Sequence, residues 1–299
     1  MTSLLPPCRF ETEWGRRGKA EGEFDIPIGI AISRRDEIFV SEFRNNRVQK
    51  FDINGRLLAV IPVGEQPGGI AVDQSSDLYV AHQMSGTIAV YNPAGQWVRQ
   101  WGGNGTAEGQ FQQPGGIVVA PNGTVYITDQ INRRVQQFTR EGKFLRKWGE
   151  YGVGAGQFGG NTPPTVRTGG PQFIASDHRG NLYTTEASVG RIQKFTPEGK
   201  YLLSWGDNSK NPGGFGGREK NLPGPIALVL DRRDRVWVSA TNNLVQQFTS
   251  GGKLLRVMGG LGTAPGKFAT PHCMALDSKG CLYVCDTQNA RIQKFIVLD

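Results

Sequence analysis

The 299-residue sequence lacks any uninterrupted apolar run that approaches the roughly 20 residues of a membrane-spanning helix. Its opening segment, MTSLLPPCRF, is too short for a secretory signal and leads at once into strand-like sequence. We therefore expect a soluble protein with no membrane partner. We place it in the cytoplasm, and outside the cell only if a leader has been removed.

Motifs of common catalytic sites are also missing. The sequence contains no Gly-x-Ser-x-Gly elbow, no Cys-x-x-Cys pair and no phosphate-binding loop. Its three histidines are scattered: His82 ends a strand-like run, His178 lies in a turn and His272 follows a proline. A catalytic zinc ion generally needs three protein ligands. We predict no metal and no cofactor, and the sequence favours a protein that is not an enzyme.

Cysteine is scarce, with four copies, Cys8, Cys273, Cys281 and Cys285. If Cys281 and Cys285 share one strand, they lie about 13 Å apart, too far for a disulfide. We expect free thiols, which suit a reducing compartment.

Glycine, in contrast, is the commonest residue, with 42 copies, and it recurs at fixed offsets that indicate turns. The stretch from Pro114 to Gly149 shows the pattern. Three runs rich in β-branched and aromatic residues, GIVVA, TVYIT and RVQQF, and a fourth that ends in Trp148-Gly149 are separated by turn sequences. This order predicts a four-stranded antiparallel sheet. Such a sheet can bury both faces only by stacking on copies of itself, as propeller blades do.

Related units recur along the chain. They predict an all-β, six-bladed β-propeller, one domain over residues 1–299, with blades at about 24–61, 67–102, 111–149, 168–206, 222–259 and 268–299. The last unit lacks a fourth strand, and residues 9–15 resemble a fourth strand with no unit before it. We expect residues 9–15 to pair with the strand Arg291 to Phe295, which closes the ring and removes exposed strand edges.

The repeated segments FQQPGGIVV, LYVCD, NARIQKF and NNRVQKF resemble the NHL repeat. The resemblance covers nearly all of residues 9–299 and implies a six-bladed propeller. It does not imply one function, because NHL propellers include RNA-binding regions, extracellular sensor domains and zinc-dependent amidating lyases. In those lyases, histidines follow a proline on the first strands of several blades, and here only His272 fits that pattern.

Several repeated residues have structural roles in this interpretation. Trp14, Trp101, Trp148 and Trp205 share one repeat position and are expected to fill the wedges between blades. An acidic residue is followed five positions later by arginine in four units, and each pair is expected to bridge its own hairpin. The pairs are Glu42 and Arg47, Asp129 and Arg134, Glu186 and Arg191, and Asp286 and Arg291.

Candidate ligand-binding residues come from one face and from the channel mouth. The connections between blades and the turns between second and third strands should share a face, and two long connections, residues 150–170 and 207–223, favour binding there. The candidates are Arg44, Arg133, Arg167, Gln172, Phe215, Arg218, Lys220 and His272. Other basic residues, Arg34, Arg35, Arg179, Arg232, Arg233 and Arg235, lie in turns that should face the opposite way.

These observations predict a monomeric, non-catalytic binding or scaffold propeller that recognises a protein, peptide or glycan through its loop-rich face. Two alternatives remain open. The net charge of +8, with an isoelectric point near 9.4, allows single-stranded RNA to bind the same face. An axial lyase or hydrolase that uses His272, Gln172 and loop residues is the second alternative.

Overall fold

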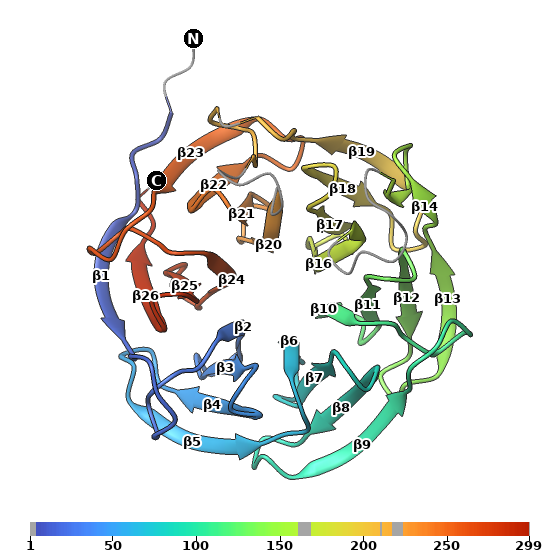
Figure 1. Cartoon of the computed structure of the whole chain (residues 1–299), viewed down its shortest axis with the longest axis horizontal. Helices are drawn as coiled ribbons and strands as arrows, with labels where there is room; N and C mark the ends of the chain where they lie inside the picture. The colour runs from blue at the N-terminus through green and yellow to red at the C-terminus, as the bar shows by residue number, and fades with distance from the viewer. Residues whose placement is uncertain (1–3, 161–168, 210, 217–223, 299) are drawn as a thin grey trace.

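In the described residues, six four-stranded antiparallel sheets are arranged as a ring, and two further short strands form a separate pair (Figure 1). The computed structural model describes residues 4–160, 169–209, 211–216 and 224–298. The predicted all-β, six-bladed propeller is confirmed. We number the blades 1 to 6 along the chain, and within each blade we count strands from the first, at the axis, to the fourth, at the rim.

The strand boundaries follow the repeat. Blade 1 contains β2 (Pro27–Ile32), β3 (Ile38–Glu42), β4 (Arg47–Phe51) and β5 (Leu57–Pro62). Blade 2 contains β6 (Pro67–Val72), β7 (Leu78–His82), β8 (Thr87–Tyr91) and β9 (Trp97–Gly102). Blade 3 contains β10 (Pro114–Val119), β11 (Val125–Asp129), β12 (Arg134–Phe138) and β13 (Phe144–Trp148). Blades 4 and 5 consist of β16 (Pro171–Ser176), β17 (Leu182–Glu186), β18 (Arg191–Phe195) and β19 (Tyr201–Trp205); and β20 (Pro225–Leu230), β21 (Val236–Ala240), β22 (Leu244–Phe248) and β23 (Leu254–Gly259). Blade 6 contains β24 (Pro271–Leu276), β25 (Leu282–Asp286), β26 (Arg291–Ile296) and β1 (Arg9–Trp14).

Blade 6 is built from both ends of the chain. Strand β1 pairs antiparallel with β26, with Trp14 opposite Ile292 and Arg9 opposite Ile296. Figure 1 shows β1 outside β26 at the rim, where the other blades carry their own fourth strands. The pairing covers the strand edge that β26 would otherwise expose.

The wedges between blades are filled by aromatic residues, as expected. Trp101 on the fourth strand of blade 2 packs against Tyr79 of its own blade, with ring centroids 6.3 Å apart. It also packs against Phe138 of blade 3, at 6.0 Å. Trp14, Trp148 and Trp205 make equivalent contacts at three other blade boundaries. Each large ring therefore joins two neighbouring blades.

Long loops lead into blades 1, 3, 4 and 6, and they share one form. In the loop before blade 4, β14 (Tyr151–Gly152) pairs parallel with β15 (Phe158–Gly159). Single parallel bridges occupy the same place in the other three loops: Arg17 with Phe24, Asn104 with Phe111, and Leu261 with Phe268. The phenylalanine of each loop is fully buried, so each loop is anchored by one core side chain.

Glycine is required where first strands approach the axis. A side chain at Gly116 would place its Cβ 2.7 Å from the Cα of Phe173 in the next blade. In the described part of the chain, no helix is long and apolar enough to cross a membrane.

Candidate functional site

The propeller has two distinct faces. The loops between blades lie on the same face as the turns between second and third strands: the side chain of Asn45, in such a turn, donates to the carbonyl of Gly18 in the loop before blade 1 at 3.1 Å. We call this the loop face. The turns that join first to second strands and third to fourth strands lie at the opposite strand ends, and we call that side the turn face.

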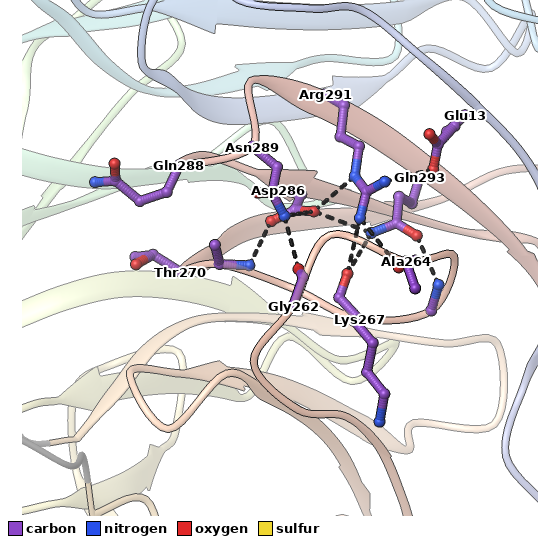
Figure 2. A network of polar contacts seen from close by, with 12 residues as sticks. Glu13, Gly262, Ala264, Lys267, Thr270, Asp286, Gln288, Asn289, Arg291 and Gln293 are labelled. Atoms are coloured by element: carbon purple, nitrogen blue, oxygen red, sulfur yellow. Dashed lines mark hydrogen bonds and ion pairs between the residues drawn. The ribbon is translucent and has the colours of Figure 1, made fainter.

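The predicted acidic and basic pairs hold the loops on the loop face. In blade 6, the fully buried carboxylate of Asp286 accepts hydrogen bonds from the backbone N–H of Ala269 at 2.7 Å and from the Asn289 side chain at 2.8 Å (Figure 2). It also pairs with Nε of Arg291 at 2.8 Å. Burial without partners would be costly for a carboxylate, and here every donor comes from the hairpin or the incoming loop.

The arginine of the pair reaches further. Its Nη2 donates to the carbonyl oxygens of Ala264 and Lys267, at 3.2 and 3.0 Å, in the loop before blade 6. Gln293 adds a bond to the same Lys267 carbonyl at 2.8 Å and accepts from the N–H of Gly266 at 2.9 Å (Figure 2). The planar guanidinium thus joins the hairpin to the backbone of the incoming loop.

The same clamp recurs in three other blades. Each carboxylate is fully buried, and the N–O distances are 2.5 Å for Arg47 and Glu42, 2.8 Å for Arg134 and Asp129, and 2.6 Å for Arg191 and Glu186. The sequence indicated a bridge within each hairpin. It did not show that the arginines also bind the loop backbone, for example Arg191 Nη1 to the carbonyl of Val153 at 2.7 Å.

Blade 2, which has no such pair, receives a short connection. Only residues 63–66 separate β5 from β6, so there is no loop for an arginine to hold. His82 occupies the acidic position and lies 3.3 Å from the carbonyl of Glu65. Burial lowers the pKa of His82, which favours the neutral ring at this position.

Side chains and backbone groups of different first strands meet near the axis. Phe173 of blade 4 meets His272 of blade 6 edge to face, with ring centroids 5.3 Å apart. Burial lowers the pKa of His272 to about 4. The carbonyl of Gln172 accepts a 2.8 Å hydrogen bond from Thr128 of blade 3. Gln172 and His272 both lie on first strands near the axis, where the sequence placed them.

The three histidines lie in three different places. His82 is on the loop face and His272 is at the axis, whereas His178 lies on the turn face and contacts Asp234 at 2.7 Å. Among the described residues, no group of three histidine, cysteine, aspartate or glutamate side chains could hold a metal ion.

Two of the predicted ligand contacts need correction. Phe215 is fully buried and packs against Phe248, at 5.7 Å between ring centroids, because it is the anchoring phenylalanine of its loop. Arg133 is only 2% exposed. Its backbone has φ of 56°, and its side chain donates to the carbonyl of Gln130 at 3.1 Å. Neither side chain is available to a ligand on the loop face.

The other basic candidates do not form a cluster in the described part of the chain. The Arg44 side chain is 63% exposed on the loop face, 3.9 Å from Asp25. Arg167, Arg218 and Lys220 lie outside the described residues.

The loop before blade 4 presents apolar side chains to solvent. Tyr151 is 46% exposed and Val153 is 51% exposed. The clamp of blade 4 fixes the backbone of residues 153–159, since the N–H of Gly159 donates to Glu186 at 2.6 Å and Arg191 donates to the carbonyl of Val153. The length of this connection predicts a binding role, but the sequence does not single out Val153.

Sequence reasoning missed the cavities on the turn face. Cavities of about 540, 320 and 470 Å³ are lined there by the turns between first and second strands. Arg34 and Arg232 line the second and third of these cavities. The available signal was that both arginines lie two positions after the residue that ends a first strand, in the matching segments SRRDE and DRRDR.

Comparison with known proteins agrees with the repeat pattern. A family model described as NHL repeat matches residues 24–51, 111–138 and 268–295, which run from the anchoring phenylalanine to the third strand in blades 1, 3 and 6. The protein named brain tumor from Drosophila melanogaster is 32% identical over 110 residues, which make up 33% of this chain and 10% of that protein. The B-box type zinc finger protein ncl-1 from Caenorhabditis elegans is 30% identical over 120 residues, which make up 34% of this chain and 14% of that protein. The chain therefore spans a small part of the length of these relatives.

Among solved structures, a streptogramin B lyase superposes with a TM-score of 0.65 at 16% identity, over 95% of this chain and 96% of that chain. A likeness at this low identity shows the shared fold alone.

Proposed function

We propose that this six-bladed propeller, three segments of which match the NHL repeat, is a non-catalytic binding module that recognises a protein or peptide partner through its loop face. The observation that carries this proposal is the loop before blade 4, which exposes Tyr151 and Val153 on a backbone fixed by the buried pair of Glu186 and Arg191. A rigid loop that presents an aromatic side chain loses little conformational entropy when a partner binds.

The residues near the propeller axis give little support for a catalytic function. The ring of His272 packs on Phe173, and the neighbouring first strands carry glycine where they approach each other most closely. A lyase or hydrolase would need several polar side chains that converge on one substrate atom. The proposal therefore places function on the surface of the ring.

The test is a double variant, Tyr151→Asp with Val153→Asp. A partner captured from native extract by the wild-type protein is purified, and its affinity for each variant is measured. We expect at least a tenfold loss, because charged groups would replace apolar contacts at the centre of the interface. Leu202→Asp is the control, since Leu202 is 43% exposed on β19 at the rim. Equal affinity for the double variant and the wild type would count against the proposal.

Single-stranded RNA is a second candidate, favoured by two exposed cations on the loop face. Arg16 is 83% exposed in the loop before blade 1, and Arg44 lies in the adjacent turn. Binding through them should weaken steeply as salt rises. Replacing both by glutamate should reduce the salt dependence of RNA affinity by about two phosphate contacts. An RNA affinity that changes neither with salt concentration nor in this double variant would exclude RNA recognition through Arg16 and Arg44.

A further inference from the structure

The 320 Å³ cavity on the turn face lies on the propeller axis. Five blades contribute to its lining, each through the end of its first strand or the turn that follows. Only a position on the axis brings these equivalent turns around one space. Its volume lies at the lower end of the range of small-molecule pockets, about 300 to 1,000 Å³.

The lining has an apolar part and a polar rim. The residues that end the first strands supply the apolar part: Ile32, Val72, Val119 and Leu230. The rim is formed by the residues two positions beyond the ends of the first strands, which are the polar Arg34, Gln74, His178 and Arg232 and, in blade 3, Pro121. Such a combination suits a ligand with an apolar body and one polar end.

Two of the rim side chains are cations without partners. Among the described residues, Arg34 and Arg232 have no ion pair or hydrogen bond through their guanidinium groups, and both residues are exposed. They occupy equivalent positions in blades 1 and 5, and the neighbouring 470 Å³ cavity is also lined by both. Guanidinium groups bind carboxylate and phosphate oxygens through paired N–H donors.

The carboxylates of the cavity are already engaged. Asp73 pairs with Arg140 at 2.7 Å, and Asp231 pairs with Arg235 at 2.6 Å. Both also cap their own turns by accepting backbone N–H groups. The charges left for a ligand are therefore positive.

The other two carboxylates are engaged in the same way. Asp177 accepts from the N–H groups of Arg179 and Asn181, at 3.0 and 2.8 Å. Asp234 accepts from both the N–H and the ring nitrogen of His178, at 3.2 and 2.7 Å, which ties blade 4 to blade 5.

We propose that this axial cavity binds a small organic anion, in which an apolar body carries one carboxylate or phosphate group. Arg34 and Arg232 hold the anionic group, and the apolar strand ends cover the body. The site lies on the turn face, opposite the proposed partner surface, so this proposal does not depend on partner binding by the loop face.

The experiment titrates the purified protein with 4-phenylbutyrate and with phenyl phosphate, followed by calorimetry and by amide chemical shifts. At least one anion should bind and shift the amides of residues 33–37 and 231–235. The better binder identifies which oxyanion the site prefers. The uncharged 4-phenylbutanol and inorganic phosphate should each bind at least tenfold more weakly, because each lacks one half of the recognised chemistry.

Variants locate the site. Arg34→Gln and Arg232→Gln should each weaken binding roughly tenfold or more, as expected for loss of a hydrogen bond to a charged group. The control is Arg35→Gln, since Arg35 is an exposed arginine in the same turn as Arg34 that lines none of the three cavities. Absence of binding by both organic anions at millimolar concentration would overturn the proposal. So would equal losses in the Arg34 and Arg35 variants.

Discussion

Removing the carboxylate of Asp286 should destabilise the protein far more than removing an exposed charge. Its two oxygens are fully buried and accept from Ala269, Asn289 and Arg291 within 2.8 Å. In Asp286→Ala, these three donors lose this acceptor, and the largely buried Arg291 guanidinium keeps, as its only ion pair among the described residues, the one with the partly exposed Glu13. Breaking a buried pair from one side costs about 3 to 5 kcal/mol.

Urea unfolding measures this loss as a change in the free energy of unfolding. The matched control is Glu108→Ala, because Glu108 forms a 3.4 Å pair with Lys147 in which both side chains are exposed. Exposed pairs contribute about 0 to 1 kcal/mol. We expect the Asp286 variant to lose at least 2 kcal/mol more than the control.

A local readout separates the clamp from general destabilisation. The N–H of Ala269 loses its acceptor in Asp286→Ala, so its hydrogen exchange should become faster than that of β24 and β25 amides in the same variant. A loss of stability no larger than that of Glu108→Ala, with unchanged exchange at Ala269, would refute the view that these pairs fix the loops.

Three further predictions concern the axis, the closing strand and the thiols. Burial lowers the pKa of His272 to about 4 in the folded protein. Near pH 6.5 the imidazole therefore gains a proton only in the unfolded chain, so folding stability decreases as the pH falls from 6.5 toward 4. Wild-type protein should therefore lose about 2 kcal/mol more than His272→Gln between pH 7 and pH 5 in urea unfolding, and equal losses would contradict the burial of this ring. Trp14→Ala should lower the free energy of unfolding by roughly 3 kcal/mol because it empties the wedge beside blade 1. Trp97→Ala, at the exposed rim, should change it by less than about 0.5 kcal/mol. Similar changes in melting temperature for the two variants would argue against a closing role of β1. Burial raises the pKa of the Cys273 and Cys285 thiols, so a thiol reagent followed by mass spectrometry should label them only after unfolding, and rapid labelling of the folded protein would disagree.

The repeat made the fold predictable. Strand periods, turn residues and the tryptophan position are local features, and one blade repeated six times is a strong pattern. The same reasoning placed the four acidic and basic pairs beside their hairpin turns. Their second role, binding the incoming loop, depends on how far an arginine reaches across space, which spacing along the chain does not reveal.

The errors at Phe215 and Arg133 have physical causes. Phe215 lies in a glycine-rich segment that reads as solvent-exposed loop, yet it repeats the position of Phe111, and that equivalence was the missed signal. Arg133 takes a left-handed backbone conformation, φ 56°, and its side chain donates to the carbonyl of Gln130. The equivalent position in the other five blades also has positive φ and is glycine or asparagine in four of them, so the repeat position was the missed signal.

The axial cavity was missed for a different reason. Arg34 and Arg232 are 198 positions apart in the sequence and line one cavity only because the blades form a closed ring. Their positions in the repeat predict turns on the face opposite the loops, but nothing in the sequence predicts that they line one cavity. Their convergence follows from the equivalence of turn positions across blades, which the structure makes visible.

The most direct test of the proposed function is hydrogen exchange of the protein alone and with its captured partner bound. The account predicts that protection appears in residues 150–160 of the loop face, while the turns at 33–37 and 231–235 exchange as in the free protein. Protection confined to the turn face, with unchanged exchange over residues 150–160, would contradict it.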